Sequence, residues 1–440
     1  MKYLFLIIIS IIAFSQTSLF AQNNTVTRDS NMLISSRSNN LLKAQDERVS
    51  VDVPIPSDKA LRYYRSGNVL WVINKIWGLL LIPVFFLFTG FSAKIRNWSQ
   101  KLGRKWFFVI GLYFIIFTVI YFIIDFPLSY YQNFLREHAY DLSSQTFWNW
   151  FGDSLKSLMV IIIGGFCFLW IPYLLIKKSP KRWWLYAGFL MVPFMFFALL
   201  IFPIWIDPLF IDFGSMKNKD LESKIIALAE KTGIEGSRVF EVNKSSDTKT
   251  TNAWVTGFLG TKRIVLYDNL IAQLNEKELL FIMGHEMGHY LLSHDVKFIS
   301  FFAVLAMIIL YAVYRTAGGL INKFKVSFGF DQLSDVASLP LILLLVNIFL
   351  ILITPIAYSF SRYQEHEADR FGLEITQTNH AAATAFVKFQ EDNLINPRPG
   401  FLYILWRCTH PTIGDRIEFC NTYHPWQEGK SLKYESYFEK

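Results

Sequence analysis

Two histidines and a glutamate lie at the spacing of a catalytic metal motif. His285 and His289 are four residues apart, and Glu286 directly follows the first of them. Residues four apart share one face of a helix, so both imidazoles can bind one zinc ion while the glutamate serves as general base of a peptidase. Asn275 and Glu278 have the spacing of a capping box, which marks a helix start. We therefore predict a helix that carries a zinc site.

A catalytic zinc ion needs a third protein ligand and an open position for water. His294 is a poor candidate, because it lies one residue short of the metzincin spacing and Leu292 occupies the position where that pattern has glycine. Residues 362–370 offer Glu365 and Asp369, four residues apart. On a helix, one carboxylate can bind the metal while the other supports a ligand histidine. Alone, this segment is typical of a solvated helix surface; beside the histidine pair it is a candidate ligand source.

The composition indicates a membrane protein. Of the 440 residues, 52% are hydrophobic and only 18% are charged, and the mean hydropathy is +0.30. This excludes a disordered chain and disfavours an ordinary cytosolic enzyme. Three scattered cysteines are too few for a disulfide framework or a cysteine zinc site. The net charge of +8 is expected in loops on one side of a membrane, so we predict no nucleic-acid partner.

Six apolar stretches are long enough to cross a bilayer, which requires about 20 helical residues. They are residues 70–93, 106–124, 157–176, 183–206, 297–314 and 338–360. Buried helices of a soluble protein are rarely so long and so free of charge. The predicted fold class is therefore mainly α: a polytopic α-helical membrane protein whose remaining residues form the peptidase part.

The loops between these stretches carry a topology signal. Residues 94–105 and 177–182 contain basic residues and no acid, whereas residues 125–156 contain more acids than bases. By the positive-inside rule the two basic loops are cytoplasmic. An even number of spans places residues 207–296 and 361–440 on one side, which this rule predicts to be non-cytoplasmic. We predict a multi-pass protein of the cell (inner) membrane.

The N-terminus resembles an export signal. A lysine, a short apolar core and a small residue before a polar stretch make residues 1–21 a signal peptide or a first transmembrane helix. A polar linker is predicted over 22–69. The other predicted divisions are a four-helix transmembrane region over 70–206, a first peptidase half with the HExxH helix over 207–296, a two-helix transmembrane hairpin over 297–360, and a second half with the ExxAD helix over 361–440.

The order of these motifs resembles the CAAX prenyl protease 1 family, membrane zinc metalloproteases of the gluzincin type. HExxH alone is common, but HExxH followed by two spans, ExxAD and then HP…R is much more restrictive. The resemblance runs over about residues 70–425 and includes Asp207–Phe210, Asn252, Ala253, Gly257, Lys262–Leu266, Asp268, Gly284–His289, Glu365–Asp369, Asn393, Leu394, Trp406, Thr409–Pro411 and Arg416.

The resemblance implies a fold and roles for single residues. The fold is a gluzincin-type domain with a small β-hairpin or sheet. Glu365 would be the third ligand of one zinc ion per chain. Asn252 and Ala253 would lie on an edge strand that pairs with an extended peptide substrate. His410 and Arg416 would lie near the metal and support the developing oxyanion; without the resemblance, His410 would be a helix cap at the surface.

The resemblance leaves orientation and substrate open. Eukaryotic members present the zinc domain to the cytosol and have seven spans, whereas this chain has six and a signal-like start. The substrate is a peptide or protein, lipidated if the reaction is CAAX-box processing and not if it is clearance of membrane proteins. The oligomeric state is open. Two other classes of protein are alternatives: a non-catalytic transporter or assembly factor with a vestigial zinc site, and an intramembrane protease, which the lack of an Asp-Gly pair disfavours.

Overall fold

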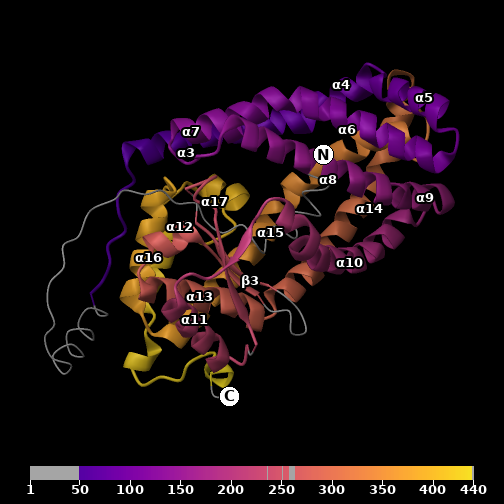
Figure 1. The fold of residues 1–440 in the computed structure, drawn as a ribbon. Helices are drawn as coiled ribbons and strands as arrows, with labels where there is room; N and C mark the ends of the chain where they lie inside the picture. Colours follow the sequence, from indigo (N-terminus) through magenta and orange to yellow (C-terminus); the bar gives the residue numbers. More distant parts are fainter. Residues whose placement is uncertain (1–48, 235, 250, 257–262, 439–440) are drawn as a thin grey trace, which may run out of the picture.

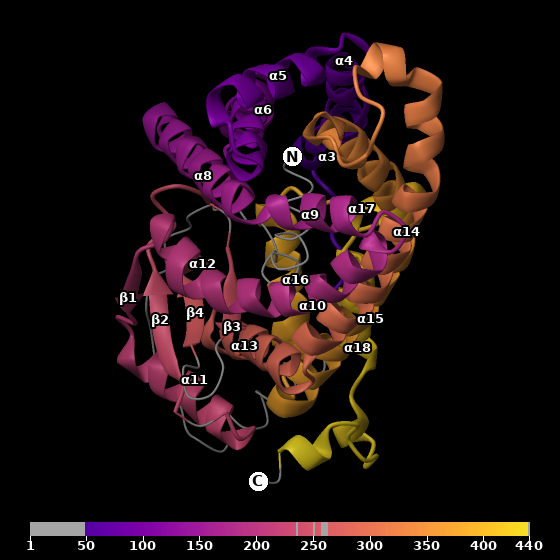
Figure 2. The same cartoon turned by 90° about the vertical axis from the view of Figure 1, so that its right-hand side faces the viewer.

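The computed structural model describes residues 49–234, 236–249, 251–256 and 263–438. The predicted signal peptide or first transmembrane helix and most of the predicted linker lie outside this range. Figure 1 shows two regions: a bundle of long helices at one end and a mixed region of helices and strands at the other. The helix α15 runs from the first region into the second, as both cartoon views show (Figures 1 and 2).

Six helical segments of the described residues are long and apolar enough to cross a membrane, as predicted. Some of them are divided by short π-helical or 3-10 turns. Their parts are α3 (Asp58–Asn74) with η1 (Lys75–Leu81) and α4 (Ile82–Phe88), α6 (Trp106–Tyr130) with η2 (Tyr131–Leu135) and α7 (Arg136–Ala139), α8 (Phe147–Phe168) with α9 (Trp170–Lys178), α10 (Trp183–Ile201) with η3 (Phe202–Ile206) and η4 (Asp207–Leu209), α14 (His294–Phe328), and η5 (Val336–Ser338) with α15 (Leu339–Thr376).

The helices extend beyond the predicted apolar stretches. The predicted linker to residue 69 is wrong at its end, because α3 begins at Asp58, where the Ser57 hydroxyl accepts a hydrogen bond from the Ala60 amide (3.1 Å). Likewise α15 continues for sixteen residues past 360 and ends at Gln377, which has a left-handed φ of 53°. Hydropathy marks the lipid-embedded part of a helix, whereas its end is set by local capping.

The second region is built around a four-stranded sheet in the order β1-β2-β4-β3. Its strands are β1 (Phe213–Ser215), β2 (Arg238–Val242), β3 (Ala253–Thr256) and β4 (Arg263–Tyr267). The pair β2 and β4 is parallel, and the other two pairs are antiparallel. Ala253 pairs with Leu266. Because β3 is the last strand in the order, it lies at one edge of the sheet.

Six further helices of the described residues belong to this region. They are α11 (Lys219–Lys231), α12 (Asp268–Gln273), α13 (Glu276–Leu291), α16 (Asn379–Asp392), α17 (Phe401–Arg407) and α18 (Ile413–Thr422). All but α17, which packs on α15, contribute side chains to a common core with the sheet. The largest cluster of buried apolar side chains joins the sheet, α11, α13, the end of α15, α16 and α18. The rest of the described helices are α5 (Phe91–Gly103), between two spans, and the short turns η6 (Pro425–Gln427) and η7 (Glu435–Tyr437) near the C-terminus.

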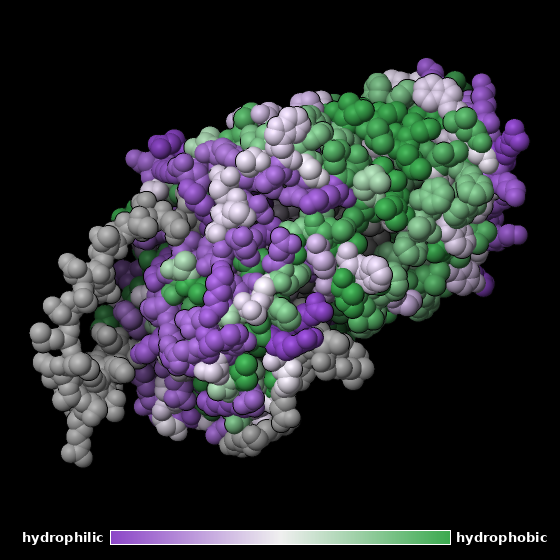
Figure 3. All heavy atoms as spheres, viewed as in Figure 1, coloured by the Kyte–Doolittle hydropathy of each residue, from purple (hydrophilic) through white to green (hydrophobic). Residues whose placement is uncertain are grey.

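The surface has a hydrophobic part and a hydrophilic part, as the sequence predicts. In Figure 3 a hydrophobic face covers the long helices, with a hydrophilic rim at their far end and a mainly hydrophilic surface over the mixed region. Exposed apolar side chains are frequent on these helices; Ile123 and Phe189, for example, are each more than half exposed. Such a belt is stable in lipid and would be costly in water. The chain is a multi-pass, mainly α-helical membrane protein with a small sheet.

Candidate metal centre

The helix α13 begins at the predicted capping box. The Asn275 side chain accepts a hydrogen bond from the Glu278 amide (3.1 Å), and the Glu278 carboxylate accepts one from the Asn275 amide (2.7 Å). Two of the amides left unpaired at a helix start are satisfied in this way. The same carboxylate also receives the Lys388 ammonium (2.6 Å) and the Thr384 hydroxyl (2.9 Å) of α16. The start of the histidine helix is thereby fixed to a neighbouring helix.

Glycines allow α13 and α15 to pack closely. A Cβ atom at Gly372 would lie 2.9 Å from the backbone nitrogen of His285, and one at Gly284 would lie 3.2 Å from the Cα of Gly372. A Cβ at Gly288 would lie 3.0 Å from the Cβ of Phe371. Small residues four apart permit such an approach between helices. The two helices that carry the predicted ligands therefore meet almost backbone to backbone.

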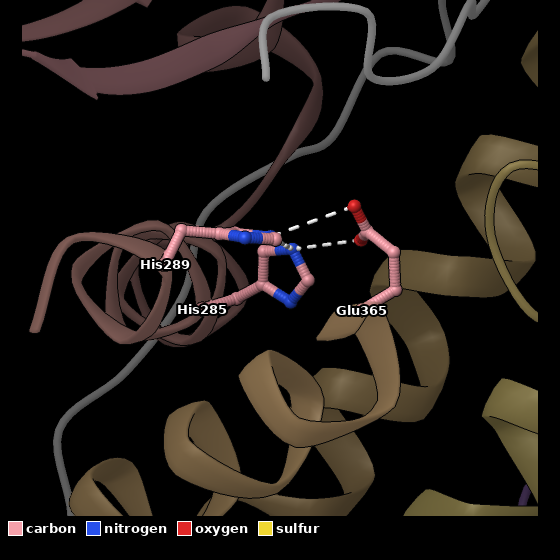
Figure 4. A group of neighbouring side chains, drawn as sticks. All are labelled: His285, His289 and Glu365. Atoms are coloured by element: carbon pink, nitrogen blue, oxygen red, sulfur yellow. Dashed lines mark hydrogen bonds and ion pairs between the residues drawn. The ribbon is translucent and has the colours of Figure 1, made fainter. Parts of the chain in front are cut away.

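The three predicted metal ligands converge on one point. Figure 4 shows the imidazoles of His285 and His289 on α13 directed toward the carboxylate of Glu365 on α15. The two Nε2 atoms are 3.1 Å apart, and the carboxylate oxygens lie 3.4 Å from His285 Nε2 and 3.6 Å from His289 Nε2. All donor atoms of the group lie within 4.8 Å of one another. Among the described residues this is the one group of its kind found.

The environment of these atoms fits a bound cation. The Oε2 atom of Glu365 is buried and has no hydrogen-bond partner among the described residues. A buried carboxylate oxygen without a donor costs free energy unless a cation binds it. The donor set, two imidazole nitrogens and one carboxylate, is that of a His₂Glu catalytic zinc site. Burial opposes charge on His285, but hydrogen bonds and charges from Asp369 and Glu365 raise its pKa to about 9.

Asp369 supports the first histidine from behind. Its Oδ1 atom lies 2.9 Å from His285 Nδ1, the nitrogen that points away from the other ligands. The Arg416 guanidinium of α18 donates to the same carboxylate from Nε (2.8 Å) and Nη2 (2.5 Å). Both side chains are almost fully buried. A carboxylate in this position holds the imidazole in the tautomer and orientation that leave Nε2 free for metal.

His294 supports the second histidine, a role that the sequence did not predict. Its Nδ1 atom lies 2.9 Å from His289 Nδ1, so one ring supports the other through the nitrogen that faces away from Glu365. Ser293, with a φ of 53°, ends α13 and turns the chain so that the buried His294 folds back onto that helix. The spacing of five residues excluded His294 as a ligand, but it gave no signal of a supporting contact.

Glu286 is buried on the same helix and its carboxylate has no hydrogen-bond partner among the described residues. Burial raises its pKa, an effect that the charges of His285 and His289 partly offset. A carboxyl group in such surroundings takes up a proton more readily than an exposed one.

His366, which is adjacent to Glu365 in the sequence, does not join the candidate ligands. It contacts the Arg370 guanidinium (3.1 Å) and packs on the ring of Phe419.

His410 and Arg416 both lie beside the ligands. The Nε2 atom of His410 is 3.3 Å from Glu365 Oε2, and Thr409 Oγ1 is 2.8 Å from its Nδ1. Burial lowers the pKa of His410 to about 4. For Arg416, Asp369 occupies two of the guanidinium nitrogens, while Nη1 is buried without a partner in the described part of the chain. The residue that caps α18 is Thr412, so His410 is not the helix cap that the sequence also suggested.

The predicted substrate residues lie at the edge strand. Ala253 opens β3, and the carbonyl of Asn252 accepts a hydrogen bond from the Tyr267 amide (3.0 Å). The strand is at one edge of the sheet and packs against α13, the helix that carries His285 and His289. Gly257 and Lys262 of the sequence pattern lie outside the described residues.

Comparison with known proteins decides the family. The description "Peptidase family M48" matches residues 215–423, and "CAAX prenyl protease N-terminal, five membrane helices" matches residues 57–212. An uncharacterized metalloprotease of Bacillus subtilis, YhfN, is 36% identical over 82% of this chain and 85% of its own. The chain belongs to peptidase family M48. It is a membrane-embedded metalloprotease, a hydrolase that uses a metal cofactor.

Further relatives agree with this assignment. The CAAX prenyl protease 1 homolog of Dictyostelium discoideum is 32% identical over 76% of this chain and 78% of its own, and CAAX prenyl protease 1 of Saccharomyces cerevisiae is 27% identical over 67% of this chain. The crystal structure of S. mikatae Ste24p superposes with a TM-score of 0.73 at 22% identity and covers 88% of this chain and 96% of its own. The predicted resemblance and fold class are confirmed, and the non-catalytic alternative is disfavoured.

Proposed function

We propose that this M48 peptidase is a zinc endopeptidase that cleaves extended peptides beside β3. The observation that carries the proposal is the convergence of His285, His289 and Glu365, with a buried Glu365 oxygen that has no hydrogen-bond partner among the described residues. When bound there, zinc lowers the pKa of a coordinated water and polarises the scissile carbonyl. Asp369 and His294 hold the two imidazoles in place.

Glu286 is proposed as the general base. It follows His285 on the same helix, and its buried carboxylate is unpaired among the described residues. In this role one carboxylate oxygen accepts the proton of the attacking water and then delivers it to the leaving amine. Burial, which raises the pKa of Glu286, favours the transient protonated form that this shuttle requires.

The peptide is proposed to bind as an added strand. β3 is an edge strand, and its start at Asn252 and Ala253 is close to the histidine helix. Main-chain hydrogen bonds to such an edge hold a substrate extended without demanding one sequence. His410 is proposed to donate from Nε2 to the developing oxyanion, since its Nδ1 can accept from the Thr409 hydroxyl. Arg416 would contribute through Nη1, while its other nitrogens hold Asp369.

The substitution Glu286→Gln tests this assignment. The amide has the shape of the carboxylate but cannot accept the water proton, so we expect turnover of a peptide to fall by at least about 10²-fold. Elemental analysis of the purified variant should still find one zinc ion per chain. Near-normal peptidase activity in this variant would exclude Glu286 as the base. A wild-type protein that contains no zinc would exclude the metal proposal independently.

Two substrate classes are compatible with this site. By likeness to its relatives the chain would process CAAX-box proteins, whose C-termini are prenylated; the second class is damaged or stalled membrane proteins. Cleavage assays with a prenylated peptide, the same peptide without its lipid, and an unfolded membrane protein separate the two. Equal kcat/KM values for the first two peptides would count against a lipid requirement.

The orientation remains our proposal from the basic loops. Residues 94–105 and 177–182 are placed in the cytoplasm and the metal centre on the opposite side of the cell membrane. A C-terminal reporter that is active on one side only tests this, because the C-terminus and the site lie in the same region (Figure 1). N-terminal sequencing of the mature protein tests whether residues 1–21 are removed.

A further inference from the structure

A cavity lies between the membrane-spanning helices, apart from the metal centre. Its volume is about 450 Å³, and nearly all of its lining is apolar. Side chains of α6, α8, α9, α10, α14 and α15 form its wall. Ile176, Trp183 and Leu339 lie at its outer end, where α9 ends and α10 and α15 begin; Gly164 and Phe197 lie at its inner end. It is partly open rather than enclosed.

The cavity is longer than one leaflet of a bilayer is thick. Trp183 and Phe197, both on α10, are fourteen residues apart, which corresponds to about 21 Å along a helix. Half of a hydrocarbon core is about 15 Å thick. A cavity that starts at the helix ends and reaches this depth therefore has the dimensions of a single alkyl chain that enters from the membrane surface.

Unpaired basic residues surround the outer end. The last residue of α9, Lys178, and the loop residues Lys181 and Arg182 are all exposed, and none of the three has an acidic partner among the described residues. Figure 3 shows the hydrophilic rim at this end of the helix bundle. An apolar slot below a group of cations is complementary to an amphiphile with a hydrocarbon tail and an anionic head. Neither feature alone would specify such a ligand.

We propose that this cavity is a binding site for an anionic phospholipid. One acyl chain occupies the space between α8, α10 and α15, and the phosphate head lies against Lys178, Lys181 and Arg182. The cavity and the candidate metal centre share no residue: none of the residues that line the cavity belongs to the group of His285, His289 and Glu365.

Native mass spectrometry of the full chain in detergent can measure this binding. The probes are phosphatidylglycerol and phosphatidylcholine with identical acyl chains, each titrated separately. We expect the first phosphatidylglycerol to bind at least about tenfold more tightly than phosphatidylcholine. The variant with Lys178→Gln, Lys181→Gln and Arg182→Gln should lose this preference. Equal affinity of the wild-type chain for both lipids would overturn the proposal.

A matched charge variant distinguishes a site from a general basic surface. Lys94→Gln, Lys101→Gln and Arg104→Gln remove three charges from α5 and the residue that follows it, which do not line the cavity. This variant should keep the preference for phosphatidylglycerol within about twofold. If it loses as much affinity as the first triple variant, the binding reflects only the overall charge of this end of the molecule, and the proposed site is wrong.

Filling the cavity tests the acyl-chain part. Ala187 lines the cavity, so Ala187→Phe should weaken binding of both lipids by at least about tenfold. Leu200→Phe adds bulk at an exposed position on the same helix outside the cavity and should leave binding unchanged. Cross-linking does not depend on the folding of these variants: a phosphatidylglycerol with a photoreactive acyl end should label wild-type peptides around Gly164 and Phe197. Labelling confined to the outer helix faces would exclude the cavity as the binding site.

Discussion

At the scale of single residues, the candidate metal centre depends on contacts behind its ligands. Each histidine uses Nε2 toward the shared point and Nδ1 toward a support, Asp369 in one case and His294 in the other. The two supports differ in kind. Asp369 is a carboxylate held by a buried guanidinium, whereas His294 offers a ring nitrogen that accepts a hydrogen bond only when it is unprotonated. Both fix the direction of an imidazole before any metal binds.

The contact from His294 predicts a graded effect on metal binding. Removal of the acceptor in His294→Leu leaves His289 free to rotate, and loss of such a support typically weakens metal affinity by about 10–100-fold. His294→Gln keeps an acceptor oxygen and should lose less. Competition with a chelator measures the affinity of each purified variant. If the Leu variant binds zinc as tightly as the wild type, the contact has no role in orienting His289.

The sequence was sufficient to predict the three candidate ligands and the support from Asp369, but not the support from His294. HExxH and ExxAD are local patterns, so His285, His289, Glu365 and Asp369 could be predicted from helix periodicity and resemblance alone. The contact of His294 depends on the left-handed Ser293, which no local pattern specifies. The pairing of Arg416 with Asp369 joins residues 47 apart in the chain, and only the folded structure places them together.

At the scale of elements, the packing of α13 against α15 sets the distance between the two halves of the metal centre. The sequence predicted both helices, but the apolar periodicity could not show that Gly372 lies under His285. It also placed the end of the last span at residue 360, whereas one helix continues to Thr376 and carries Glu365. Hydropathy indicates whether a helix lies in lipid or in water, but it gives little information about which helix packs against it.

This close approach predicts that Gly372→Ala separates the two helices. The new Cβ would lie 2.9 Å from the backbone nitrogen of His285, too close to be accommodated without movement. We expect thermal unfolding in detergent to show a destabilisation of about 1–3 kcal/mol, together with weaker zinc binding. Gly152→Ala on α8 is the control, because nothing lies within 4 Å of that site. Unchanged metal affinity in the Gly372 variant would show that the spacing is tolerant.

At the scale of the whole molecule, one junction links the membrane region to the loop before the edge strand β3. The loop after α7 contacts the loop before β3: Ser143 and Thr248 form an isolated bridge, and the Asp247 carbonyl accepts from Ser143 Oγ (3.2 Å) and the Ser144 amide (3.3 Å). Asp268, at the end of β4, holds the second loop through the amides of residues 244 and 245 (2.9 and 3.0 Å). No sequence pattern predicted this junction, because its parts are about 100 residues apart.

The junction predicts a role for Asp268 in substrate binding. Partial burial opposes its charge, but hydrogen bonds from Ser245 and from neighbouring amides lower its pKa. A lowered folded-state pKa stabilises the fold above the ordinary aspartate pKa, and this contribution is lost as pH falls through the lowered value. Asp268→Asn should therefore remove part of the acid dependence of stability and cost about 1–2 kcal/mol near neutral pH.

In kinetic assays the same variant should raise KM for peptides more than it lowers kcat, because the edge strand is displaced while the catalytic groups remain. Asp220→Asn serves as control, since that carboxylate contacts only Lys224 on an exposed surface among the described residues. A kcat decrease without a change in KM would contradict the assignment of Asp268 to the substrate strand.

The continuous course of α15 has a mechanical consequence. A single 38-residue helix starts at the basic end of the bundle and ends beyond Glu365, the third candidate metal ligand, with Pro355 as the one proline inside it. Helices in bilayers tilt as the hydrocarbon thickness changes. A change in membrane thickness would therefore change the tilt of α15 and move the Glu365 carboxylate relative to the two imidazoles. Through this helix, lipid composition would alter the geometry of the candidate metal centre.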